Sequence, residues 1–197
     1  MDTQNHFFLS DSPFCVNNHL SVLNNVQKVL KWARNRHVLM VSTVHVNNSS
    51  AAHVGSFLAG GFSIDKPTCT LCRSRILLKA MDCTDLPSGL VEQYQQVILH
   101  KRAFDPFSEP RFDRLLTELN ANNFVVIGAP TEGAVKATTL GLLARGERVA
   151  VVTDAIGSLN SRLAKKALRQ MKAKGARLVN TAALLNLTRM ARPAPCN

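Results

Sequence analysis

The chain has 197 residues, 46% of them hydrophobic, and a formal net charge of +11 at pH 7. These values suit one domain over residues 1–197 with its own core, and no apolar run is long enough to span a membrane. Residues 1–6 lack the pattern of a secretory signal, and five cysteines do not indicate a disulfide scaffold, so we expect a cytoplasmic protein with reduced thiols.

The predicted elements alternate between helices and strands along the chain. In order, they are a helix over 16–36, a strand over 37–46, a long loop over 47–66, a helix over 86–93, a strand over 95–100, a helix over 111–120, a strand over 124–127, a helix over 134–145, a strand over 148–154, a helix over 159–174, a strand over 177–180 and a last helix. This alternation predicts a three-layer α/β/α sandwich with a mainly parallel, doubly wound sheet. Residues 191–197 are expected to form a flexible tail.

Much of the positive charge lies in the predicted helix over 159–174 and just after it. The cations are Arg162, Lys165, Lys166, Arg169, Lys172, Lys174 and Arg177. Their spacing leaves Leu163, Ala167, Leu168 and Met171 for a buried stripe. Because few aromatic residues are interleaved with these cations, we favour a solvated basic face over a nucleic-acid interface.

The first residues indicate a strand that is not part of the sequence. Residues 2–8 have the composition of a turn leaving the carboxyl end of a strand, but only Met1 precedes them. Either the protein lacks that strand, or Met1 lies downstream of the original start of the chain. Since such a strand would be central, its neighbours would keep unpaired backbone groups, and we expect an oligomer partner or a rearranged strand to fill the gap.

Three positions are candidates for chemistry in the predicted topology. Asp2 precedes a polar turn, Lys101 follows a strand, and Ala134 begins a helix after the turn that starts at Gly128. All three lie at carboxyl ends of parallel strands, where open α/β sheets place their active sites. We therefore expect them on one rim of the sheet.

Several motifs in the chain resemble, in order, those of the isochorismatase-like (cysteine hydrolase) family. Asp2-Thr-Gln-Asn-His-Phe is similar to its Asp-x-Gln-Asn-Asp-Phe motif, and His100-Lys101-Arg-Ala-Phe104 to its strand-end lysine with a following aromatic residue. Gly128-Ala-Pro-Thr-Glu-Gly-Ala134-Val-Lys-Ala-Thr138 is similar to its Gly-Val-x-Thr-x-x-Cys-Val-x-x-Thr signature. The resemblance spans nearly the whole chain and implies that family's fold, a small-molecule substrate and a homo-oligomer.

The resemblance also implies the roles of the site residues. In the amidase branch, the residue matching Asp2 is a general base, and the residue matching Lys101 lowers the pKa of that aspartate and of the thiol. A cysteine attacks the carbonyl carbon, and backbone N–H groups at the helix start hold the oxyanion. Pro130, Thr131 and Gly133 would belong to the binding turn. Ala134 stands at the nucleophile position, and a methyl group cannot attack a carbonyl.

Two functional readings remain open because the cysteine is replaced. The vinyl-ether branch of the family also lacks it, and there the aspartate acts as general acid while water attacks. The first reading is thus a hydrolase with an Asp2/Lys101 site and no cysteine nucleophile, and the alternative is an inactive binding or scaffold protein. Thr131 is disfavoured as a substitute nucleophile, since no histidine adjacent in sequence could activate it.

No cofactor, metal or nucleotide is expected. Some family amidases bind zinc through an Asp-x-His pair, but the matching residues here are Thr43 and His45. A set of Cys69, Cys72, Cys83 and His53 is disfavoured as a zinc site, because one CxxC with a lone third cysteine is a weak signal. The resemblance and the low energy of a cis X-Pro bond predict a cis peptide between Ala129 and Pro130.

Overall fold

A computed structural model describes residues 1–46 and 65–187 of the chain. The helices are α1 (His19–Asn35), α2 (Leu90–Gln93), α3 (Pro110–Leu119), α4 (Lys136–Ala144), α5 (Ser161–Ala173) and α6 (Thr181–Leu187). The strands are β1 (Met40–His45), β2 (Arg75–Leu78), β3 (Gln96–Lys101), β4 (Asn123–Gly128), β5 (Arg148–Ile156) and β6 (Arg177–Val179). Most of the predicted loop over 47–66 and the predicted tail over 191–197 lie outside the described residues.

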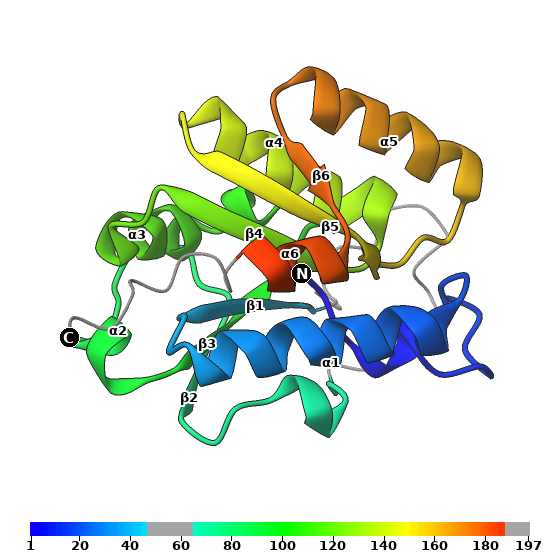
Figure 1. Ribbon diagram of the computed structural model, residues 1–197. Helices are drawn as coiled ribbons and strands as arrows, with labels where there is room; N and C mark the ends of the chain where they lie inside the picture. Colours follow the sequence, from blue (N-terminus) through cyan, green and yellow to red (C-terminus); the bar gives the residue numbers. More distant parts are fainter. Residues whose placement is uncertain (47–64, 188–197) are drawn as a thin grey trace, which may run out of the picture.

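The strands form a parallel α/β architecture, as the sequence predicts. They make two three-stranded sheets of order β1-β3-β2 and β4-β5-β6, and all strand pairs are parallel. Among the described strands, no pairing joins β1 to β4, so the predicted sheet is divided into two parts. Instead, the first residues of the chain lie between β1 and β4, where the N-terminus is marked in Figure 1.

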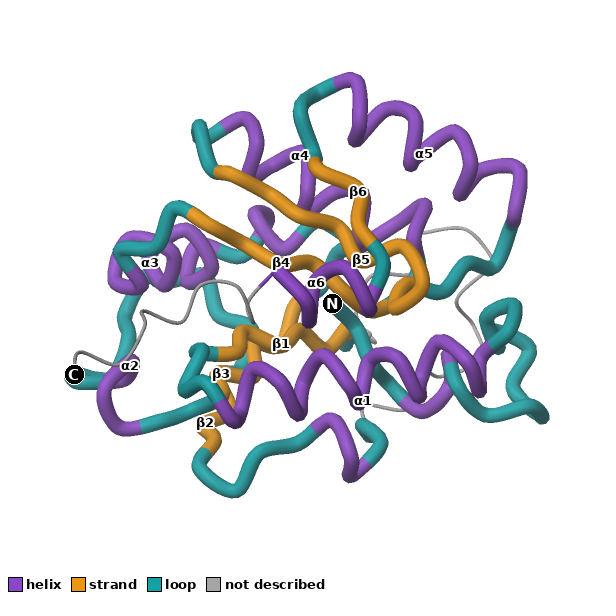
Figure 2. The backbone as a smooth tube through the Cα atoms, in the orientation of Figure 1, coloured by secondary structure: helices purple, strands orange, loops and turns teal. Residues whose placement is uncertain are grey.

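Helices cover both faces of the strands, which gives the predicted three layers. Figure 2 shows the strands between α1 on one side and α4 and α5 on the other. On the first side, Val26 of α1 and Leu184 of α6 share a core with Val152 of β5. On the second side, Leu142 of α4 and Met171 of α5 share a core with strand residues of the second sheet.

The structure differs from the prediction at two elements. Strand β2 was not predicted; it is a short edge strand of four residues in which only Leu78 is buried. Helix α2 begins at Leu90 rather than at residue 86, since Gly89 has a left-handed backbone with φ +66° and Pro87 precedes it. The remaining elements lie within a few residues of their predicted bounds.

The predicted buried stripe of α5 needs one correction. The buried residues of this helix are Ala164, Ala167 and Met171. Leu163 is 51% exposed, so its prediction as a core residue is wrong. Asn160 caps the helix by accepting bonds from the Arg162 and Leu163 backbone N–H groups, which fixes Leu163 in the first, solvent-facing turn.

No helix within residues 1–46 and 65–187 is long and apolar enough to cross a membrane.

Candidate active site

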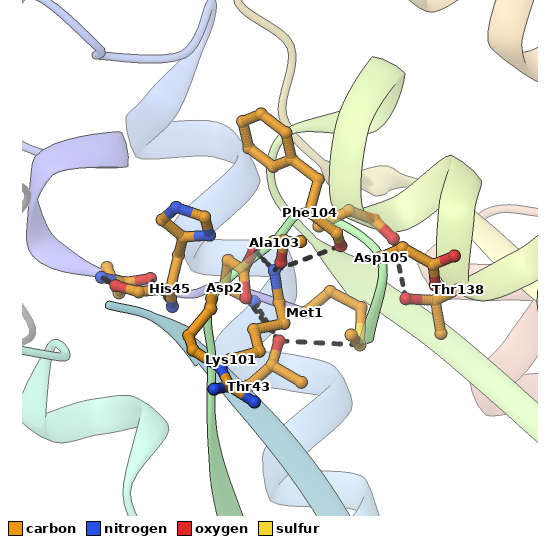
Figure 3. Close-up of polar contacts among 12 residues, drawn as sticks. Met1, Asp2, Thr43, His45, Lys101, Ala103, Phe104, Asp105 and Thr138 are labelled. Atoms are coloured by element: carbon orange, nitrogen blue, oxygen red, sulfur yellow. Dashed lines mark hydrogen bonds and ion pairs between the residues drawn. The ribbon is translucent and has the colours of Figure 1, made fainter. Parts of the chain in front are cut away.

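A buried ion pair lies where the first residues of the chain meet the end of β3. The Lys101 ammonium stands 2.7 Å from Asp2 Oδ2, and both side chains are 0% exposed (Figure 3). The Thr43 hydroxyl donates to Asp2 Oδ1 at 2.5 Å and accepts from the Asp2 backbone N–H at 3.0 Å. Asp2 has a left-handed φ of 37°, a conformation uncommon outside glycine that often marks functional sites.

Lys101 is held by acceptors on several sides. Besides Asp2, its Nζ donates to the carbonyl oxygens of Ala103 at 2.8 Å and Phe104 at 3.2 Å. An ammonium has three donors, so this set matches its capacity. The charge of Lys101 is therefore fixed in place beside the Asp2 carboxylate, and the sequence prediction that places these two residues together agrees with the geometry.

A second buried lysine borders the site and was not predicted from the sequence. Lys66 Nζ donates to Thr3 Oγ1 at 2.6 Å and to the Thr43 carbonyl at 3.4 Å. Burial lowers the pKa of Lys66 to about 8, while the negative charge of Asp2 acts in the opposite direction. In the sequence Lys66 closes a polar loop, and a lysine in such a segment is normally solvated, so no local signal could reveal it.

The turn after β4 lies against the same residues. The Ala129 N–H donates to the Met1 carbonyl at 3.0 Å, and the Ala129–Pro130 peptide bond is cis. A Cβ built on Gly133 would stand 3.2 Å from Phe104 Cδ1, so this part of the turn packs on the residue whose carbonyl binds Lys101. The rim therefore carries Asp2, Lys101 and the turn together.

Ala134 lies in a π-type turn, Thr131–Val135, ahead of α4 rather than at the first residue of that helix. Its side chain is fully buried, and its carbonyl accepts from the Thr138 hydroxyl at 2.7 Å. The Gly133 and Val135 backbone N–H groups both donate to the Pro130 carbonyl at 3.2 Å. These two N–H groups are thus engaged within the turn, whereas the resemblance implies donors to an oxyanion at this place.

The polar side chains of the turn have structural partners. The Thr131 hydroxyl donates to the Gly157 carbonyl at 2.8 Å, so this buried group is already engaged. Glu132 Oε1 accepts from the backbone N–H groups of Leu159 and Asn160 just before α5. The Thr131 hydroxyl and the Glu132 carboxylate are therefore both engaged in bonds that hold the turn.

His45, at the end of β1, stacks on Phe104 with ring centroids 5.4 Å apart. Its backbone exchanges two hydrogen bonds with the Gln4 amide side chain, at 2.7 and 3.1 Å. Burial, followed by the positive charge of Lys101, lowers the pKa of His45. The imidazole and the Phe104 ring thus form an aromatic pair next to the ion pair.

Among the described residues, His45 has no carboxylate two positions earlier that would complete an Asp-x-His zinc pair. The position two residues earlier is Thr43, whose hydroxyl is bonded to Asp2. Within residues 1–46 and 65–187, no three His, Cys, Asp or Glu residues form a group that could hold a metal ion. Cys69, Cys72 and Cys83 lie within these ranges, whereas His53 of the disfavoured zinc set lies outside the described residues.

Several solved structures are similar to this chain in their fold. The chain is similar to an isochorismatase family protein from Desulfovibrio vulgaris (23% identity, TM-score 0.70, 97% of this chain and 95% of that chain covered). It is also similar to a cysteine hydrolase from Pseudomonas syringae (14%, TM-score 0.75, 97% and 91%). A third is the pyrazinamidase of Pyrococcus horikoshii in complex with zinc (21%, TM-score 0.67, 91% and 95%).

No curated protein matches the chain. Residues 1–183 match the family described as Isochorismatase domain, which covers both the Asp2–Lys101 pair and the turn at Ala134. The parallel α/β fold, the rim geometry and this match agree, and the chain therefore belongs to the isochorismatase family of hydrolases.

Proposed function

We propose that this protein hydrolyses a small molecule by water attack at the Asp2–Lys101 site, without a covalent enzyme intermediate. The observation that carries the proposal is the buried ion pair at 2.7 Å on the rim, beside the turn of the binding motif. A charged pair with no exposed surface is costly to keep for stability alone, because desolvation offsets much of its attraction. A role in proton transfer gives a reason for keeping it.

The contacts of the Asp2 carboxylate indicate a role for each residue of the site. Asp2 is the proton-transfer group, since it is the acidic member of the pair. Lys101 holds the carboxylate in one orientation and supplies positive charge to oxygens that become negative during hydrolysis. Thr43 orients Asp2 through its hydroxyl, so it is a positioning residue.

The absent thiol defines which reactions remain. With Ala134 at the nucleophile position, the oxygen that attacks the substrate comes from water. In amide hydrolysis Asp2 would accept a proton from that water, and in vinyl-ether hydrolysis it would deliver a proton to the alkene carbon before water adds. Both reactions use one carboxyl group at the same position, and the substrate class decides between them.

A substrate screen with matched variants tests the proposal. Small amides, carbamoyl compounds and vinyl ethers are offered to the wild type, to Asp2→Asn, and to Asp113→Asn as a control in an exposed ion pair. We expect turnover by the wild type and the control, and a loss of about 10²-fold or more in kcat for Asp2→Asn. Turnover that survives Asp2→Asn at the wild-type rate would refute the role of Asp2.

Restoring the thiol is a second test of the same site. We expect Ala134→Cys to gain amide hydrolysis that is sensitive to thiol alkylation, because the turn that carries position 134 packs on Phe104, whose carbonyl binds Lys101. Ala134→Ser is the matched control, since its hydroxyl is a weaker nucleophile. Equal activity of Ala134→Cys and wild type on all amides would show that position 134 does not face the substrate.

The alternative is a non-catalytic binding or scaffold protein on the same fold. Two observations favour it: the methyl group at position 134, and the engagement of the Gly133 and Val135 N–H groups by the Pro130 carbonyl. Under this alternative, small-molecule binding measured by calorimetry would persist while no substrate class is turned over. The substrate screen therefore separates the two readings.

A further inference from the structure

An open groove runs along the outer face of α5, the helix at the upper edge of the molecule in Figure 1. Its volume is about 1030 Å³, and its lining includes Arg162, Leu163, Lys165, Lys166 and Arg169. All five side chains are exposed, because the helix packs on the protein through a different face. We call these five residues the α5 basic groove.

The four cations of this groove are arranged in a way that does not favour the helix itself. Arg162 and Lys166 are four residues apart, as are Lys165 and Arg169, and like charges at this spacing repel each other on a helix surface. Arg162 also lies in the first turn, at the positive end of the helix dipole, and that turn has no acidic residue. A partner that neutralises these charges explains the cluster better than the stability of the helix does.

No carboxylate in the described part of the chain neutralises these cations. Within residues 1–46 and 65–187, none of the four forms an ion pair, whereas the exposed Arg145 is paired with Asp113. The sequence has no Asp or Glu after Asp154, so every charged residue beyond that position is a cation. The positive charge of the groove is therefore available to a partner.

The start of α5 is already occupied by acceptors of the protein itself. Glu132 Oε1 accepts from the backbone N–H groups of Leu159 and Asn160. The Asn160 side chain accepts from two N–H groups of the first turn. An anionic partner is therefore expected to bind the cationic side chains rather than the helix N-terminus.

An apolar side chain stands among the cations. Leu163 is 51% exposed within the groove, and Leu159, just ahead of the helix, is 36% exposed. A partner that covers the groove would remove apolar surface from water while it neutralises charge. This combination suits a partner that carries apolar and acidic groups together.

Other anionic partners fit this combination less well. Single-stranded nucleic acids stack on aromatic residues, and the sequence has no Phe, Tyr or Trp after Phe124. A membrane-binding helix inserts its apolar face, but Ala167 and Met171 of α5 are buried in the core of the protein. A second copy of the chain carries the same net charge of +11 and would be repelled. These points favour an acidic polypeptide.

We propose that the α5 basic groove binds an acidic segment of another protein, with carboxylates on its four cations and an apolar side chain on Leu163. From position 162 to position 169 the helix rises by about 10 Å, which is the length of about three residues of extended chain. The segment therefore carries its carboxylates and its apolar residue close together in sequence. No residue of the groove belongs to the candidate active site, so the proposal is independent of the proposed function.

The test uses the full chain and a short fluorescent peptide in which pairs of Glu alternate with Leu. We expect saturable binding by fluorescence anisotropy, with a Kd below about 100 μM at about 0.15 M salt. The double variant Lys166→Glu with Arg169→Glu should raise the Kd at least about tenfold, because each reversal replaces attraction by repulsion. Lys31→Glu with Arg148→Glu is the matched control, since it changes the net charge equally at two exposed cations outside α5. This control should raise the Kd less than about threefold.

Two peptide controls separate charge from apolar contact and need no protein variant. Replacing every Glu of the peptide by Gln should abolish binding, because the cations then have no counter-charge. Replacing its Leu residues by Ser should weaken binding about threefold or more, and Leu163→Ser in the protein should have a similar effect.

Three results would each overturn the proposal. The first is a lack of saturable binding of the acidic peptide by the wild type. The second is an equal Kd for the α5 double variant and its control, which would show that only the net charge of the protein matters. The third is tighter binding to a single-stranded oligonucleotide, or to vesicles of phosphatidylserine and phosphatidylcholine, than to the peptide at the same salt concentration. In that case the partner is a nucleic acid or a lipid surface and not a protein.

Discussion

At the scale of single residues, the site depends on charges that are buried in pairs. Asp2 and Lys101 are both fully buried and 2.7 Å apart, so removing either one leaves the other without its counter-charge in a region away from water. Such a pair adds little net stability, but breaking it is strongly destabilising. The stability of this rim is therefore coupled to the groups proposed to act in catalysis.

Replacing the lysine of the pair has a predictable effect on folding. We expect Lys101→Met to lower the free energy of unfolding by about 3–5 kcal/mol, because the Asp2 carboxylate stays buried without its partner. Asp113→Asn breaks the exposed Arg145–Asp113 pair and should change the same quantity by less than about 1 kcal/mol.

Urea denaturation at pH 7 measures both variants. The double variant Asp2→Asn with Lys101→Met should recover part of the loss, since it leaves no unpaired charge. If the double variant were as unstable as Lys101→Met, packing rather than charge would explain the effect.

Lys66 makes stability depend on pH in the alkaline range. Its folded pKa is about 8, against an ordinary value of 10.5 in the unfolded chain. Between these values the folded protein has released the proton while the unfolded chain still holds it, so the unfolded state binds more protons and stability rises with pH. Below pH 8 both states are protonated, and the burial of the charge is a constant penalty.

We expect the wild type to gain stability relative to Lys66→Met as the pH rises from 8 to 10.5. Comparing the two proteins by urea denaturation at each pH cancels the titration of other groups. A difference between them that stays constant across this range would show that Lys66 titrates normally in the folded protein.

At the scale of elements, α5 is a helix whose position was predicted correctly but whose buried face differs from the one that its apolar pattern indicates. The residues 163, 167 and 171 follow helical spacing, and the sequence placed Leu163 in the buried stripe with Ala167 and Met171. In the structure Leu163 is half exposed, while Ala164 is buried in its place. Helical periodicity locates an apolar stripe only to within about one residue, because neighbouring positions differ by 100° around the axis.

This difference predicts unequal effects for two apolar residues of α5. Met171→Ala should lower the free energy of unfolding by about 2–5 kcal/mol, since it opens a cavity against α4 and the second sheet. Leu163→Ala should change it by less than about 1 kcal/mol, because that side chain is already half in water. Thermal or urea unfolding of the two variants side by side checks the prediction. Similar losses in both would place Leu163 in the core.

At the scale of the whole molecule, the parallel α/β arrangement and the family follow from the order of elements and motifs. The alternation of helices and strands predicted the layers, and the match to the Isochorismatase domain agrees with the resemblance read from the residues. Only the structure shows that β1 and β4 do not pair with each other and that the first residues of the chain lie between them. A homo-oligomer and the absence of a nucleic-acid partner remain predictions.

The sequence by itself determined the fold class, the order of the elements other than β2, and three candidate positions for the site, because periodicity and strand-end motifs are local properties of the chain. It also has an alanine at position 134, where the resemblance implies a cysteine, and this is a matter of residue identity. Only the tertiary structure decided that Lys66 joins the site, that Thr131 is engaged by Gly157, and that the Met1 nitrogen bonds to the Ile127 carbonyl. These are contacts between residues 26 to 126 positions apart, and their energies depend on burial and geometry that no local pattern contains.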